Sequence, residues 1–105
     1  MDTDKRYSIR KSVALDILIN YDLSYPRLWK TRNLSTDGAF VICQRGDLPL
    51  AALVEAVLVL RYHDEYEPHR LPAQIVRHGH DGVGIKFGDY ANRTFIALEN
   101  LLGNV

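Results

Sequence analysis

The chain has 105 residues, which is the length of one ordinary domain. Hydrophobic residues make up 47% and charged residues 25% of the sequence, a balance that excludes an intrinsically disordered chain. The formal net charge is zero, so general binding to nucleic acid or to a membrane surface, which favours basic proteins, is not expected. No run of about 18 apolar residues and no signal peptide occurs, and the single Cys43 cannot form an internal disulfide. These features predict a cytoplasmic protein.

The first segment, residues 1–11, is polar and charged and carries the cations Lys5, Arg6 and Arg10. It has too little apolar surface to pack against a core, so we predict a flexible N-terminal arm in the free protein. A basic arm of this kind can become ordered when a ligand binds. The alternative interpretation is a solvated tail with no role in binding.

Six strands are predicted between residues 12 and 88, from the alternation of apolar and polar side chains and from the turn residues that separate them. The predicted strands cover residues 12–21, 27–33, 39–43, about 54–62, 71–78 and 83–87. The polar segment 63–69 is predicted to be a loop or an edge hairpin. Its histidines and acids lack the spacing of a metal site.

After the last strand the apolar period changes to three or four residues, which predicts a helix over about residues 90–102. We expect Asp89 to cap this helix and Gly103 to end it. The predicted fold class is therefore mainly β. It is a small six-stranded antiparallel β-barrel over residues 12–88 with a C-terminal α-helix over 89–103, forming one domain over the whole chain.

Two polar motifs are candidates for ligand binding: R-x-x-x-R at Arg6 and Arg10, and N-x-S-x-x-G at Asn33, Ser35 and Gly38. Arginine side chains match phosphate oxygens and the O6/N7 edge of guanine. An Asn amide can donate and accept at a base edge, while Asn and Ser also favour turns and Gly permits a positive φ. A ligand with guanines and phosphates would use all of these groups. The alternative is solvated charges beside a plain hairpin turn.

This pair of motifs resembles the signature of the PilZ domain family, which is R-x-x-x-R followed by [D/N]-x-S-x-x-G. The run from Ala73 to Phe87 also resembles the final hairpin of that family, so the resemblance covers most of the chain. It implies a small β-barrel that binds the bacterial second messenger cyclic di-GMP. The binding residues that it implies are Arg6, Arg10, Asn33, Ser35 and Gly38.

Lys5 directly precedes Arg6 and adds a third cation to the expected site. Cyclic di-GMP can stack into an intercalated dimer, which concentrates twice the phosphate charge in one place. Extra cationic groups stabilise that charge. We therefore count Lys5 among the expected binding residues and predict two ligands per domain.

The sequence favours a binding module over an enzyme. Cys43 lies in an apolar strand, where a thiol is usually inert, and neither a phosphate-binding loop nor a nucleophile motif is present. No cofactor, metal or nucleic-acid partner is expected. The resemblance implies a monomer or weak dimer that changes its surface for an unidentified partner protein, in motility, exopolysaccharide or pilus control. The alternative is a PilZ-like adaptor that binds a protein but no nucleotide.

Overall fold

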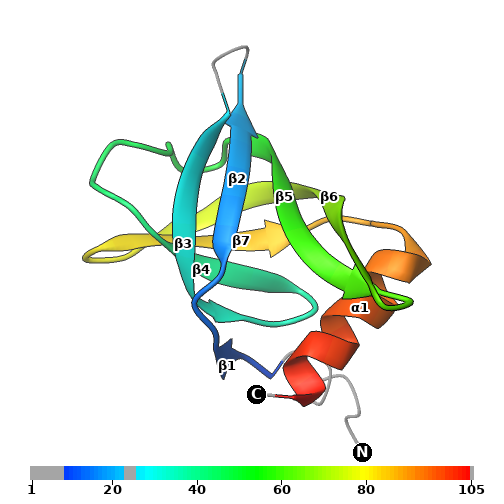
Figure 1. The fold of residues 1–105 in the computed structure, drawn as a ribbon. Helices are drawn as coiled ribbons and strands as arrows, with labels where there is room; N and C mark the ends of the chain where they lie inside the picture. Colours follow the sequence, from blue (N-terminus) through cyan, green and yellow to red (C-terminus); the bar gives the residue numbers. More distant parts are fainter. Residues whose placement is uncertain (1–8, 23–25, 105) are drawn as a thin grey trace, which may run out of the picture.

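The structure, a computed structural model, describes residues 9–22 and 26–104 and arranges them as a closed sheet with one helix beside it (Figure 1). Seven strands and one helix occur in this described part. In chain order they are β1 Lys11–Ser12, β2 Asp16–Tyr21, β3 Arg27–Leu34, β4 Gly38–Ile42, β5 Leu53–Tyr62, β6 Glu65–His78, β7 Gly82–Phe87 and α1 Asn92–Gly103. None of the described helices is long and apolar enough to cross a membrane.

The sheet is antiparallel throughout and closes on itself. Its strand order is β1-β3-β2-β5-β6-β7-β4, and β4 also pairs with β3. That last pairing converts β2 to β7 into a six-stranded barrel, as predicted. The two-residue strand β1 is additional and pairs with β3, where Lys11 lies opposite Leu34.

The predicted first strand over residues 12–21 is interrupted. β1 ends at Ser12 and β2 begins at Asp16. In the gap, the fully buried Thr31 hydroxyl donates to the carbonyl of Val13 at 2.6 Å and accepts from the backbone N–H of Leu15 at 3.0 Å. This side chain of β3 adds to the two backbone hydrogen bonds that remain here, from the Val13 N–H to the Arg32 carbonyl and from the Thr31 N–H to the Leu15 carbonyl. Alternation alone does not reveal this arrangement.

The barrel interior is filled by the apolar side chains of alternating strand positions, as the sequence pattern predicts. The most deeply buried members are Ile17, Ile19, Leu34, Val41, Leu58, Leu71, Ile75 and Ile85, and Leu98 of the helix α1 is equally buried. Burying an aliphatic side chain of this size contributes about 1.5–3 kcal/mol. This shared interior holds in place the outer surface, on which the polar motifs lie.

The segment 63–69 forms a hairpin, which confirms the second of the two predicted alternatives. His63 and Asp64 make a two-residue turn with φ values of 52° and 67°, and β6 begins immediately afterwards at Glu65. Two left-handed residues suit the right-handed twist of the flanking strands. β6 is consequently 14 residues long and starts earlier than the predicted fifth strand.

The predicted cap at Asp89 is wrong. α1 begins at Asn92, and the residue that precedes it, Ala91, has an extended backbone and makes no side-chain cap bond. The chain stays extended because the Tyr90 hydroxyl donates to the Thr36 carbonyl at 2.6 Å and its ring meets Phe87 edge-on. The helix then packs Thr94, Ala97, Leu98 and Leu102 against one end of the barrel, beside the β5–β6 hairpin (Figure 1).

Candidate ligand-binding site

Ser35 shapes the turn between β3 and β4. Its hydroxyl accepts hydrogen bonds from the backbone N–H groups of Asp37 and Gly38, at 3.1 and 3.2 Å. Its own backbone N–H donates to the Gly38 carbonyl at 2.9 Å. Only 1% of Ser35 is exposed. The side chain thus has a complete structural role in the turn, and its contact with a ligand stays a prediction.

Gly38 is required for strand pairing and not for its backbone angle. It opens β4 opposite Lys86 of β7, and a Cβ at this position would lie 2.1 Å from the carbonyl oxygen of Ile85. Gly46 is the only described glycine with a positive φ. The reason that we gave from the sequence, a left-handed turn residue, is therefore wrong. The missing side chain lets β4 and β7 approach each other.

Asn33 joins the two motifs. Its side-chain oxygen Oδ1 accepts a hydrogen bond from the Arg10 guanidinium at 3.1 Å and one from the backbone N–H of Phe40 at 3.2 Å. A β-bulge in β3 between Thr31 and Asn33 turns this side chain to the outer surface. The second arginine of R-x-x-x-R and the first residue of N-x-S-x-x-G are thus in direct contact.

The pairing registers place a row of residues across four neighbouring strands. Asn33 of β3 lies opposite Phe40 of β4, Phe40 opposite Gly84 of β7, and Gly84 opposite Arg77 of β6. Phe40 alternates with the inward-facing Ala39 and Val41, so its ring lies on the outer face of the barrel. The row is a strip across the outer face, with the amide of Asn33 at one end and the guanidinium of Arg77 at the other.

Arg77 is a candidate binding residue that the sequence analysis missed. Its guanidinium lies over Gly84, where a Cβ would be 3.2 Å from Nε, and 5.9 Å from the Phe40 ring centroid. In the described part of the chain no carboxylate lies within 4.0 Å of it. A glycine opposite an arginine in the predicted final hairpin is the signal that would have revealed it.

Arg10 and Arg77 act on each other electrostatically. Partial burial is the main cause that lowers the pKa of Arg10; the positive charge of Arg77 lowers it further, and Asp37 opposes both effects. Both guanidinium groups remain charged at neutral pH. Arg32 stacks over the same Phe40 ring at 4.9 Å, but it is paired with Asp81. Within residues 9–22 and 26–104, the strip and Arg10 beside it therefore present two cations that lack a bonded carboxylate, which suits an anionic ligand.

Two expected binding residues, Lys5 and Arg6, lie outside the described residues, as does most of the predicted arm 1–11. Their positions therefore stay predictions. Of the rest, the structure brings Arg10 and Asn33 together and places Ser35 and Gly38 in the adjoining turn. A cavity of about 750 Å³ lies elsewhere, between α1 and the β5–β6 hairpin.

Comparison with known proteins decides the family. A family model described as the PilZ domain matches residues 4–104. The chain belongs to the PilZ domain family. PilZ domains form a family of cyclic di-GMP receptors and adaptors, and they are regulatory binding domains rather than enzymes. No curated protein matches this PilZ domain.

Solved structures similar to this PilZ domain share its fold. The PilZ domain of CeSA from a cellulose-synthesizing bacterium is 22% identical, with a TM-score of 0.68 over 92% of this chain and 97% of that one. The Bacillus subtilis inhibitor of motility, MotI/DgrA, is 13% identical with a TM-score of 0.76, over 92% of this chain and 49% of that one. An uncharacterized Legionella protein is 18% identical with a TM-score of 0.59, over 91% and 96% of the two chains.

Proposed function

We propose that this PilZ domain binds cyclic di-GMP on the strip formed by Asn33, Phe40, Gly84 and Arg77, next to Arg10. The observation that carries the proposal is the Arg10–Asn33 hydrogen bond, since it joins the two family motifs on one surface. Family membership supports the choice of ligand. The domain then acts as a cytoplasmic receptor that passes the signal to a partner protein.

The chemistry of the strip suits a ligand with two phosphates and two guanines. Arg10 and Arg77 each offer a planar set of donors to phosphate oxygens or to the O6/N7 edge of guanine. With its Oδ1 already engaged, Asn33 has its amide Nδ2 left to donate to a base. The Phe40 ring is 7% exposed and supports Arg77 from below, so its role is to position that cation.

The arm would complete the site. Arg6 is the first arginine of R-x-x-x-R and Arg10 the second. We propose that Arg6 and Lys5 close over a ligand that is bound to the strip. Ordering the arm costs roughly 1–2 kcal/mol for each residue fixed, and charge-assisted hydrogen bonds to phosphate offset that cost. The closed arm is then a new surface for the partner protein, so the switch needs no chemical step.

One observation favours a second candidate, a protein-binding adaptor without nucleotide. Ser35 and Gly38 are both used by the fold itself, so these two motif positions can persist in a domain that has lost its ligand. Arg77 supports the nucleotide, because it adds a second cation near Arg10 and has no ion pair with any of the described carboxylates.

Calorimetry on the purified chain tests the proposal with cyclic di-GMP, GTP and cyclic GMP as titrants. We expect cyclic di-GMP to bind, with a ratio of two ligands per domain, and raised salt to weaken binding. GTP and cyclic GMP should bind far more weakly, because neither places two guanines and two phosphates on one strip. Equal affinity for the three nucleotides, or no binding of any of them, would overturn the proposal. The protein-binding adaptor would then be the remaining candidate function.

A further inference from the structure

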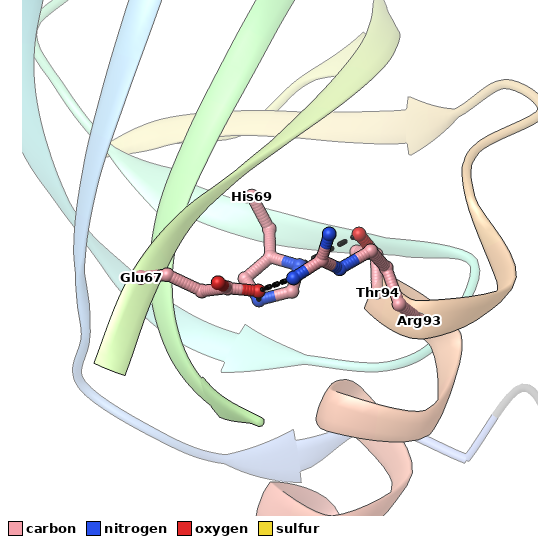
Figure 2. A network of polar contacts seen from close by, with 4 residues as sticks. All are labelled: Glu67, His69, Arg93 and Thr94. Atoms are coloured by element: carbon pink, nitrogen blue, oxygen red, sulfur yellow. Dashed lines mark hydrogen bonds and ion pairs between the residues drawn. The ribbon is translucent and has the colours of Figure 1, made fainter. Parts of the chain in front are cut away.

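His69 is buried in a polar cluster between β6 and α1 (Figure 2). Only 3% of the residue is exposed. Its Nδ1 lies 2.7 Å from the Thr94 hydroxyl in the first turn of α1. Its Nε2 makes no hydrogen bond in the described part of the chain and lies 3.4 Å from a Glu67 carboxylate oxygen. One imidazole therefore links the helix to the barrel.

The charges around His69 balance only while the imidazole is neutral. Glu67 of β6 is bonded to Arg93 of α1, so the nearest carboxylate is already neutralised. Arg93 also lies 5.1 Å from the ring centroid of Tyr62 on β5, and that ring meets the imidazole edge-on at 6.5 Å. No other charged group is in contact with the cluster among the described residues. A proton on His69 would leave a net charge of +1 at a buried position.

The helix end disfavours that charge as well. α1 has no acidic residue in its first turn and no side-chain cap, so the positive end of its dipole is opposed by no charge of its own. Thr94 belongs to this turn, and its own backbone N–H donates to the Ala91 carbonyl, so the imidazole bonded to its hydroxyl lies at the positive end of the helix. Burial and the helix dipole both disfavour the protonated form of His69.

The grouping of Thr94, His69 and Glu67 has the order of a hydrolase triad, but its burial excludes that role. Thr94 and His69 are each 3% exposed, so the hydroxyl faces the protein interior and no substrate can reach it. The cluster must act on the structure itself, through the contact between α1 and β6.

We propose that His69 is an acid-sensitive latch, in which the neutral imidazole fastens the first turn of α1 to β6 and protonation releases that turn. In the neutral state the Thr94 hydroxyl donates to Nδ1. In this tautomer the neutral imidazole carries its proton on Nε2, facing Glu67, and protonation adds an N–H at Nδ1, so the hydrogen bond from the Thr94 hydroxyl must reverse. The released turn would change the outer face of the helix that a partner protein meets.

The pKa of His69 agrees in direction with this geometry. Burial is the main cause that lowers it, Glu67 opposes this by raising it, and Arg93 lowers it by a smaller effect. Because the folded pKa lies below the unfolded value of about 6.5, the latch contributes fully above that pH. Its contribution is lost as the pH falls below about 6.5 and through the folded pKa.

Two measurements on the full chain test the latch. The first is an NMR titration of the His69 imidazole, which should give a midpoint below about 6.5. Arg93→Gln should raise that midpoint and Glu67→Gln should lower it, since the two charges act in opposite directions. A midpoint at or above the ordinary value, or a shift of the same sign in both variants, would overturn the proposal.

The second measurement is amide hydrogen exchange of α1 at pH 7.5, 6.5 and 5.5, corrected for the intrinsic pH dependence. Between the pKa of His69 in the unfolded chain and its pKa in the fold, the equilibrium constant for opening of α1, compared with that of β5, should rise by up to about tenfold for each unit by which the pH falls. His69→Gln should abolish that dependence, while the exposed control His80→Gln should keep it. If His69→Gln does not fold, His69→Leu replaces it, because it also removes the titrating group and keeps an apolar side chain at this buried position. An unchanged pH dependence in the folded variant would refute the latch.

Discussion

The side-chain oxygen of Asn33 holds the guanidinium of Arg10, 23 positions earlier in the chain, at 3.1 Å. The same oxygen accepts the Phe40 backbone N–H, so the contact is anchored in the β3–β4 ladder. A residue from the end of the arm is thereby held on the barrel surface, beside the first residue of N-x-S-x-x-G.

Replacing Arg10 with Ala should weaken cyclic di-GMP binding by about 1.5–3 kcal/mol, the size expected for hydrogen bonds to a charged group. The fold should survive, because Arg10 is exposed and precedes β1. Calorimetry measures the affinity, and thermal unfolding checks the fold. Arg45→Ala is the matched control, since it removes an exposed cation from the loop after β4. If Arg10→Ala unfolds the barrel instead, the residue is structural.

Arg77→Ala should reduce affinity by at least about tenfold, or about 1.4 kcal/mol, if the second guanidinium contacts the ligand. Arg77→Lys should recover little, because an ammonium cannot make the two parallel hydrogen bonds of a guanidinium. Arg70→Ala removes the same charge from the same strand, at a position paired with Glu55, and should leave the affinity unchanged. If Arg77→Ala binds cyclic di-GMP as tightly as the wild type does, Arg77 is not part of the site, and only the residues of the two sequence motifs remain as candidates.

Gly38→Ala should destabilise the domain, by about 1–3 kcal/mol or more, because its Cβ would lie 2.1 Å from the Ile85 carbonyl oxygen. Urea unfolding measures the change. Gly103→Ala is the control, since nothing lies within 4 Å of a Cβ there and its φ is not positive. That control should leave stability unchanged or raise it by up to about 1 kcal/mol. Equal stability of the two variants would contradict the close approach of β4 and β7.

Tyr90→Phe should cost about 0.5–1.5 kcal/mol, because it removes the hydrogen bond to the Thr36 carbonyl. The stability of the wild-type protein should also fall in alkali. Burial, followed by Asp37 and Glu99, raises the pKa of Tyr90 to about 12. The neutral phenol therefore stabilises the fold below the unfolded pKa of about 10, and that contribution is lost as the pH rises through about 12. Between pH 9 and 12, the free energy of unfolding should therefore change less with pH in Tyr90→Phe than in the wild type, as measured by denaturation at each pH.

The barrel could be predicted from the sequence because each strand buries alternate side chains, and alternation is visible in one chain. Residues 83–87 show this directly, with Val83, Ile85 and Phe87 turned inward. The start of α1 could not be predicted, because Tyr90 is held by a carbonyl 54 positions earlier. Likewise, the break before β2 depends on Thr31, a residue from another strand. Contacts between distant segments decide both features.

For the candidate site, the motifs indicated residues that the structure brings together in part, but their binding roles stay predictions. Arg10 and Asn33 meet as their chemistry indicates. Ser35 and Gly38 resemble ligand contacts in the sequence, yet their described partners are backbone groups of the turn and of β7. Arg77 was missed because its place in the row depends on strand register, which a sequence motif does not encode.

The hydrogen bond from Tyr90 to Thr36 has a consequence for signalling. It ties the turn of the N-x-S-x-x-G motif to the residue that leads into α1. If ligand binding shifts this turn and thereby favours a partner protein on α1, linkage makes the effect reciprocal: the bound partner must tighten the ligand by the same factor. The concentration of partner in the cell would then set the messenger level at which this receptor responds.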